Sequence, residues 1–205
     1  MEPWLYFQTP VYSFIMPEYL ESARTVSTGY LVEIKNEVSV DPLYPMSQTY
    51  SFNNDDRISN LSTEIIRTCY NILDSQGYDL TNYELFFTEF WCQEHLKTSG
   101  QVRHIHGYNN VLTGFYFIDC PENSCKLVIH EPRNAKEFGD YLPEKDASVA
   151  SHASQAINFA PQDGQLIITN SWLPHTFTRN GSNSPFCMIH FNVAARWKAN
   201  NPEIV

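Results

Sequence analysis

Two histidines separated by one residue precede an apolar, aromatic segment in the middle of the chain. The stretch QVRHIHGYNNVLTGFYFID, residues 101–119, contains His104 and His106. If this segment is extended, both imidazoles project from one face, with their Cα atoms roughly 7 Å apart. Imidazole is the commonest protein ligand for transition metals. The spacing therefore indicates a pair of metal ligands, although such a pair also occurs as ordinary surface or hydrogen-bonded structure.

A third histidine lies far along the chain, after another apolar segment. His175 belongs to NSWLPHTF and directly follows the expected strand GQLIITN and the rigid step Leu173-Pro174. Three ligands from distant strands of a β-barrel form a facial metal site, which leaves neighbouring positions open for a cosubstrate and dioxygen. His104, His106 and His175 are therefore candidate metal ligands and candidate catalytic residues.

The chain has seven histidines, and the other four differ in their surroundings. His95 and His152 lie among polar residues and are expected to be solvated. His130 ends a strand just before EPR. His190 shares one face of FCMIHFN with Phe186, Met188 and Asn192, so it would look into the pocket if that face is the barrel interior. The alternative is a hydrogen-bonded core histidine.

Composition favours one packed globular domain over residues 1–205. Of the 205 residues, 42% are hydrophobic and 14% are aromatic, which is enough apolar surface for a full core. The net charge of −10 and the pI of about 5.0 argue against non-specific nucleic-acid binding, since phosphates attract basic surfaces. A local basic patch is still compatible with these values.

The cysteines and the first residues of the chain bear on its compartment. The five cysteines form an odd set without CxxC spacing, which favours reduced thiols in a cytoplasmic protein. The opening MEPWLYFQTP lacks the basic start and apolar centre of a signal peptide. No apolar run is long enough to cross a bilayer. We therefore expect a cytoplasmic protein without a membrane segment.

Apolar periodicity divides the chain into a helical part, residues 1–79, and a β part, residues 80–205. We expect helices at 17–38 and 58–76, where apolar residues recur at helical spacing, with a strand before them and a polar loop at 47–56. The strands of the β part are expected at 82–95, 111–121, 126–133, 155–161, 164–172 and 186–197. This order predicts an α+β, mainly β fold, a β-sandwich or jelly roll buttressed by N-terminal helices. The irregular connection 134–155 is expected to form a lid or substrate loop.

The order of these segments resembles a known enzyme family. The sequence FTEFW, RHIHGYNNVLTGFYFIDCPENSCKLVIHEPR, PQDGQLIITNSWLPHTF, FCMIHFN, and the opening YFQTPVYSF, is similar to the 2-oxoglutarate- and Fe(II)-dependent oxygenases. The closest resemblance is to a branch found in marine bacteria and cyanophages and related to prolyl hydroxylases. It implies a double-stranded β-helix with helices packed on its larger sheet. It also implies Fe(II) held by His104, His106 and His175, with 2-oxoglutarate and dioxygen as cosubstrates.

Two positions in the resemblance concern the cosubstrate. Tyr116 matches a tyrosine that can hydrogen-bond the cosubstrate in relatives, or it is simply a core aromatic residue. His106 stands where most of the superfamily has a carboxylate, so the implied iron site keeps a higher positive charge.

The last strand departs from the family pattern. Phe186 occupies the position of the arginine that pairs with the distal carboxylate of 2-oxoglutarate, and phenylalanine cannot form that charge-assisted pair. Another cation, Lys126, Arg133 or Arg179, could replace it. Alternatively, Phe186 and His190 shape a pocket for a less charged cosubstrate, or the protein has lost catalysis and kept the fold.

These observations lead to one main function and two alternatives. We expect an Fe(II)- and 2-oxoglutarate-dependent dioxygenase that hydroxylates a peptidyl proline or a small molecule, in a bacterial cell or a phage-infected host. The first alternative is a cupin-like three-histidine metalloprotein that does not use 2-oxoglutarate. The second is a non-catalytic jelly-roll module of a phage or bacterium. The sequence leaves a homodimer open.

Overall fold

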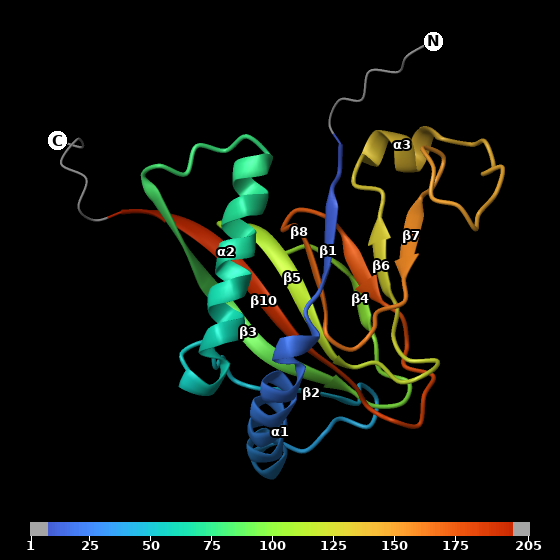
Figure 1. The fold of residues 1–205 in the computed structure, drawn as a ribbon. Coiled ribbons are helices and arrows are strands. Elements are labelled where there is room, and N and C mark those ends of the chain that lie inside the picture. Colours follow the sequence, from blue (N-terminus) through green and yellow to red (C-terminus); the bar gives the residue numbers. More distant parts are fainter. Residues whose placement is uncertain (1–7, 199–205) are drawn as a thin grey trace.

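Two antiparallel β-sheets form the β part of the computed structural model, which describes residues 8–198 (Figure 1). In spatial order, the larger sheet contains β1 (Val11–Ile15), β8 (Gln165–Asn170), β5 (Asn110–Asp119), β10 (Phe186–Trp197), β3 (Tyr83–His95) and β2 (Met46–Gln48). The smaller sheet contains β4 (Gln101–His104), β9 (His175–Phe177), β6 (Leu127–His130) and β7 (Ala156–Phe159). The chain is thus mainly β, as predicted.

Two long helices precede β3 in the sequence, close to where periodicity predicted them. They are α1 (Leu20–Glu37) and α2 (Ser59–Ser75), each entered through a short 3-10 turn, at Pro17–Tyr19 and Asp56–Ile58. Asp55 caps the second turn by accepting a hydrogen bond from the backbone N–H of Arg57. Gly77 follows α2 with a φ of 90°, a left-handed conformation suited to glycine.

One hydrophobic core joins the helices to the larger sheet. Leu61, Ile65, Cys69 and Ile72 recur at helical spacing along α2 and are all buried. They belong to one cluster with apolar residues of β3, β5 and β10. In Figure 1 both helices lie on the same side of this sheet.

A second core lies between the two sheets. Phe115 and Phe117 of β5 face it together with Phe177, Phe186 and residues of β6. The alternate residues of β5, such as Tyr116 and Ile118, belong to the helix-side core. Because both faces of β5 and β10 are buried, these strands read as nearly continuous apolar runs in the sequence.

Three short elements were not predicted from the sequence. The segment 47–56, expected to be a loop, begins within β2, and β9 follows Pro174 directly. The connection 134–155 starts with the short helix α3 (Asn134–Gly139). Strands of three residues are too short to show an apolar alternation, so tertiary pairing decides them. The first residues of the YFQTPVYSF resemblance, 6 and 7, lie outside the described residues.

No helix within residues 8–198 combines the length and the apolar character needed to cross a membrane.

Two glycines offer a matched test of the packing. A Cβ on Gly114 of β5 would lie 2.3 Å from the ring of Phe191 and 2.9 Å from the carbonyl oxygen of Ile167. We expect Gly114→Ala to lower the free energy of unfolding by about 1–3 kcal/mol, the usual cost of overpacking. Gly29 of α1 has open space around it. Gly29→Ala should raise the free energy of unfolding by about 0.5–1 kcal/mol, because alanine has the higher helix propensity. Urea denaturation measures both, and equal effects would contradict the packing described here.

Candidate metal centre

Three histidines converge at one end of the smaller sheet. Two of them lie in strands, and the third lies in the loop that follows one of these strands. His104 ends β4 and is the direct cross-strand partner of His175, the first residue of β9. His106 lies just beyond β4, and its backbone N–H donates to the carbonyl of Ser171 at 2.8 Å. The ring centroids lie 4.5 Å apart for His104 and His175, 4.9 Å for His104 and His106, and 5.1 Å for His106 and His175. One nitrogen of each ring lies within 4.8 Å of those of the other two.

A tight turn separates these histidines from β5. Tyr108 and Asn109 have φ values of 60° and 72°, so the backbone is left-handed at two consecutive residues. Asparagine adopts this conformation more readily than most residues, whereas tyrosine rarely does. After the turn the chain passes from β4 of the smaller sheet to β5 of the larger sheet.

Backbone carbonyls orient two of the three rings. Nδ1 of His104 lies 2.8 Å from the carbonyl oxygen of Val102, and Nδ1 of His175 lies 3.0 Å from that of Leu173. A ring that donates from Nδ1 keeps a free lone pair on Nε2. Nε2 of His175 and Nε2 of His106 are buried and have no hydrogen-bond partner. Buried polar atoms without partners are rare, and a metal ion would satisfy these two.

The environment keeps these ligands neutral. Burial lowers the pKa of His175 to about 3. Burial, followed by the neighbouring histidines, lowers the pKa of His106 to about 2. Imidazole must be unprotonated to bind a metal, so both side chains are in the binding form at neutral pH. A donor set of neutral imidazoles suits Fe(II), and the residues present therefore fit the ion that the sequence resemblance implies.

His190 faces the interior beside the three histidines. It is buried, and its ring centroid lies 4.6 Å from that of His106 and 5.3 Å from that of Phe115. Glu89 of β3 offers a carboxylate oxygen within 4.8 Å of ring nitrogens of both His106 and His190. Sequence reasoning did not single out Glu89. Its alternation with Trp91 along β3, toward the same face, is the signal that could have identified it.

Phe186 is buried among aromatic residues, and the residue opposite it is unexpected. His95, the cross-strand partner of Phe186, is completely buried, so the prediction of a solvated side chain is wrong. Its ring centroid lies 6.0 Å from that of Phe186, and Nδ1 lies 2.9 Å from the hydroxyl of Ser99. Nε2 has no partner, and burial lowers the pKa of His95 to about 4. His95 is buried because Phe177 and Phe186 pack against its ring, while β2 pairs with the backbone of residues 93–95.

The other residues predicted to contact the cosubstrate lie elsewhere. Tyr116 points toward the helix-side core, and its hydroxyl donates to the carbonyl of Met16 at 2.8 Å. Lys126, Arg133 and Arg179 are exposed. Arg133 also forms an ion pair of 2.7 Å with Glu131.

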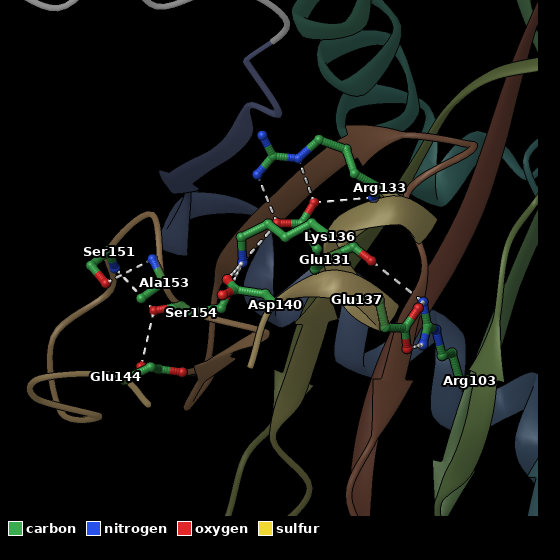
Figure 2. A network of polar contacts seen from close by, with 10 residues as sticks. All are labelled: Arg103, Glu131, Arg133, Lys136, Glu137, Asp140, Glu144, Ser151, Ala153 and Ser154. Carbon is green, nitrogen blue, oxygen red and sulfur yellow. Dashed lines mark hydrogen bonds and ion pairs between the residues drawn. The ribbon is translucent and has the colours of Figure 1, made fainter. Parts of the chain in front are cut away.

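A network of charged residues connects α3 to Arg103 and to Glu131 (Figure 2). Arg103, which precedes His104, lies 2.5 Å from the Glu137 carboxylate of α3. The carboxylate of Glu131, after β6, binds Arg133 and also lies 3.4 Å from Nζ of Lys136. Hydrogen bonds from Arg133, and to a smaller extent from Lys136, lower the pKa of Glu131 to about 2. Burial acts in the opposite direction but is outweighed. The segment 134–155 is therefore held at its first turn, beside a candidate ligand.

Substitution of Glu131 tests this attachment. Glu131→Gln removes the charge that binds both cations, and a hydrogen bond to a charged group contributes about 1.5–3 kcal/mol. We expect backbone amides of residues 134–155 to exchange with deuterium roughly tenfold faster or more, on that scale. Glu122→Gln, at an exposed residue of another loop, is the control. Unchanged exchange in 134–155 would show that the network does not hold the segment.

Solved structures with the same fold include several oxygenases. A prolyl-4-hydroxylase from Pseudomonas putida is 9% identical with a TM-score of 0.59, and the alignment covers 93% of this chain and 94% of that one. A prolyl hydroxylase from Trichoplax adhaerens, in complex with a hypoxia inducible factor peptide, is 13% identical with a TM-score of 0.53 and coverages of 89% and 82%. HygX from Streptomyces hygroscopicus, with nickel, 2-oxoglutarate and hygromycin B bound, is 13% identical with a TM-score of 0.54 and coverages of 91% and 83%. At these identities the likeness shows a common fold.

A family model gives the stronger result. No curated protein matches the chain in sequence. The model described as "Putative 2OG-Fe(II) oxygenase" matches residues 89–192, which are 104 of the 205 residues, and this range includes all three histidines. The chain therefore belongs to this family of 2-oxoglutarate- and Fe(II)-dependent oxygenases, as the order of its motifs indicated.

Proposed function

We propose that the protein binds one Fe(II) ion through His104, His106 and His175 and uses 2-oxoglutarate and dioxygen to hydroxylate an organic substrate. The convergence of the three rings carries this proposal, because the Nε2 atoms of His106 and His175 are buried and lack any other partner. Family membership supports the choice of Fe(II) and 2-oxoglutarate over other metals and cosubstrates.

Each part of the site has a distinct task in such a reaction. Iron, when bound, supplies the activation of dioxygen, driven by oxidative decarboxylation of 2-oxoglutarate. The three imidazoles hold the ion and leave the remaining coordination positions free. Phe115 packs against His175, with 5.3 Å between ring centroids, and helps to exclude water on the inner side. Because all three ligands are neutral, the ion keeps its full charge to attract an anionic cosubstrate.

A cavity beside His106 is the proposed entrance for the substrate. Its volume is about 340 Å³, and it is lined by Thr88, Glu89, Ile105, His106, Gly107, Tyr108, Asn110 and Asn192. A ligand in this cavity would lie against one of the proposed iron ligands, which is the position that a hydroxylation target requires. HygX binds a small molecule and the Trichoplax enzyme a peptide, so we propose a substrate from one of these two classes.

We propose that His95 meets the distal carboxylate of 2-oxoglutarate where the family has an arginine. His95 and Phe186 are opposite each other on the inner face of β3 and β10. Nε2 of His95 is buried without a partner and can donate a hydrogen bond to a carboxylate. Lys126, Arg133 and Arg179 are exposed, which makes His95 the better candidate.

We also propose a cytoplasmic location and a single domain. All five cysteines are free thiols, which supports the reducing cytoplasm as the location. We propose that residues 1–205 form a single oxygenase domain.

A second candidate function follows from Phe186. An aromatic residue at the arginine position, buried in an apolar cluster, favours a three-histidine oxygenase that acts without a dicarboxylate. In such an enzyme the metal would activate the substrate and dioxygen directly.

Substitution of the histidines tests the metal assignment. His104→Ala and His175→Ala should each abolish stoichiometric Fe(II) binding, because two imidazoles and water form a much weaker site. The metal content of protein reconstituted without oxygen, measured by mass spectrometry, gives the answer. His152→Ala, at an exposed residue, is the control and should keep one ion per chain. Full metal content in the His104 or His175 variant would refute the assignment.

An anaerobic titration tests the cosubstrate assignment. The Fe(II) protein should develop a visible charge-transfer band with 2-oxoglutarate. In His95→Phe the dissociation constant should rise about 10- to 100-fold, the equivalent of a lost hydrogen bond to a charged group of about 1.5–3 kcal/mol. Pyruvate, which lacks the distal carboxylate, should bind both proteins equally. Absence of the band in the unmodified protein would favour the second candidate function, and equal affinities for 2-oxoglutarate would remove His95 from the site.

A further inference from the structure

Glu89 lies beside His106, and ligand atoms of Glu89, His106 and His190 lie within 4.8 Å of one another. Asn192 of β10 connects the two residues, because its side-chain nitrogen lies 3.0 Å from Nδ1 of His106 and also donates to the Glu89 carboxylate. Asn192 and Glu89 are direct cross-strand partners, so the strand pairing fixes their relative position. His106 therefore presents Nδ1 to this pair and Nε2 to the metal centre.

His190 is the second neighbour of Glu89. Nε2 of His190 lies 3.5 Å from the Glu89 carboxylate, and the His190 ring is tilted by 31° against the ring of His106. The pKa of the Glu89 carboxyl is lowered, because first His190 and then Asn192 face its charged form. Glu89 thus lies between the side chains of His190 and Asn192.

No cation balances this anion in the part of the chain that the structure describes. Neither lysine nor arginine within residues 8–198 lies at ion-pair distance from Glu89. The side chain of Glu89 is 35% exposed, on the wall of the cavity beside His106. By contrast, Glu84 of the same strand pairs with Arg196 at 2.6 Å and is more exposed. The missing counter-charge of Glu89 would be supplied by a metal ion at the three histidines.

The three histidine ligands lack negative charge, whereas Glu89 lacks a positively charged partner. Three neutral imidazoles leave the full charge of a divalent ion uncompensated, whereas a set with one carboxylate ligand removes part of it. When a metal binds Nε2 of His106, the remaining ring proton is on Nδ1 and needs an acceptor. The amide nitrogen of Asn192 faces Nδ1, so it must turn away when Nδ1 carries the proton. The Glu89 carboxylate, with an oxygen within 4.8 Å of a His106 ring nitrogen, is then the acceptor. A hydrogen-bonded carboxylate behind a histidine ligand raises the basicity of that ligand.

We propose that Glu89 is the outer carboxylate of the metal centre, which acts through His106 to supply the negative charge that the inner ligands lack. Glu89 is a positioning residue, since no contact between it and the metal is required. This inference rests on the metal assignment made under Proposed function.

The test measures metal binding without cosubstrate or substrate. Co(II), which has a visible spectrum at such sites, is titrated into the metal-free protein and into its Glu89→Gln variant. We expect the dissociation constant of Glu89→Gln to rise about 10- to 100-fold, the usual effect of removing a partner of a metal-bound histidine. The Fe(III)/Fe(II) reduction potential should also become more positive, because lost negative charge destabilises Fe(III) more than Fe(II). A purely structural role for Glu89 would not shift that potential.

Two further variants make the result specific. Glu89→Asp keeps the charge and should give a potential close to that of the unmodified protein, even if its shorter side chain weakens Co(II) binding. Glu84→Gln removes a carboxylate from the same strand and should change neither quantity. If the unmodified protein binds no Co(II), the metal assignment fails and this inference fails with it. If it binds Co(II) and Glu89→Gln matches it in affinity and potential, only the role of Glu89 is refuted.

Discussion

The pairing of β4 with β9 is the constraint on which the candidate metal centre depends. These two short strands place His104 directly opposite His175, and residues before each histidine anchor its ring through a backbone carbonyl. His106 completes the set from outside the strand, tied to Ser171 by its own backbone N–H. A shift of one residue in this register would turn one imidazole to the opposite face of the sheet. The geometry of the site is therefore a property of backbone hydrogen bonds more than of side-chain packing.

The two faces of the larger sheet have different roles, stability on the outer face and chemistry on the inner face. The outer face of the larger sheet carries the helices and an apolar core, which makes that side a rigid support. Its inner face carries aromatic residues toward one end and His190 with Glu89 and Asn192 toward the other, where they face the histidines of the smaller sheet. β10 connects these regions, because Phe186, His190 and Asn192 all lie on its inner face. Alternation along one strand thus sets the distance between the proposed cosubstrate pocket and the metal centre.

Much of this arrangement could be predicted from the sequence, and the failures share a cause. Periodicity identified both long helices and the long strands, and the histidines were recognised by residue type and motif order. His95 was placed in solvent because its neighbours Gln93 and Glu94 are polar, yet all three are buried, and His95 packs against Phe177 and Phe186. Glu89 was overlooked because a glutamate in a strand has no distinctive sequence context. In both cases the decisive contact comes from a strand remote in sequence, which local pattern does not reveal.

The position of β10 also orders events during synthesis. This strand lies between β3 and β5. Those two strands do not pair with each other and are joined only through β10. All three proposed ligands precede β10 in the chain and leave the ribosome before it. Contacts between strands far apart in sequence form late, because a long loop must close first. The larger sheet, and with it the side of the pocket that holds His190 and Asn192, is therefore incomplete until β10 is made. His190 and Asn192 would therefore join the proposed metal centre only after its three ligands have been made.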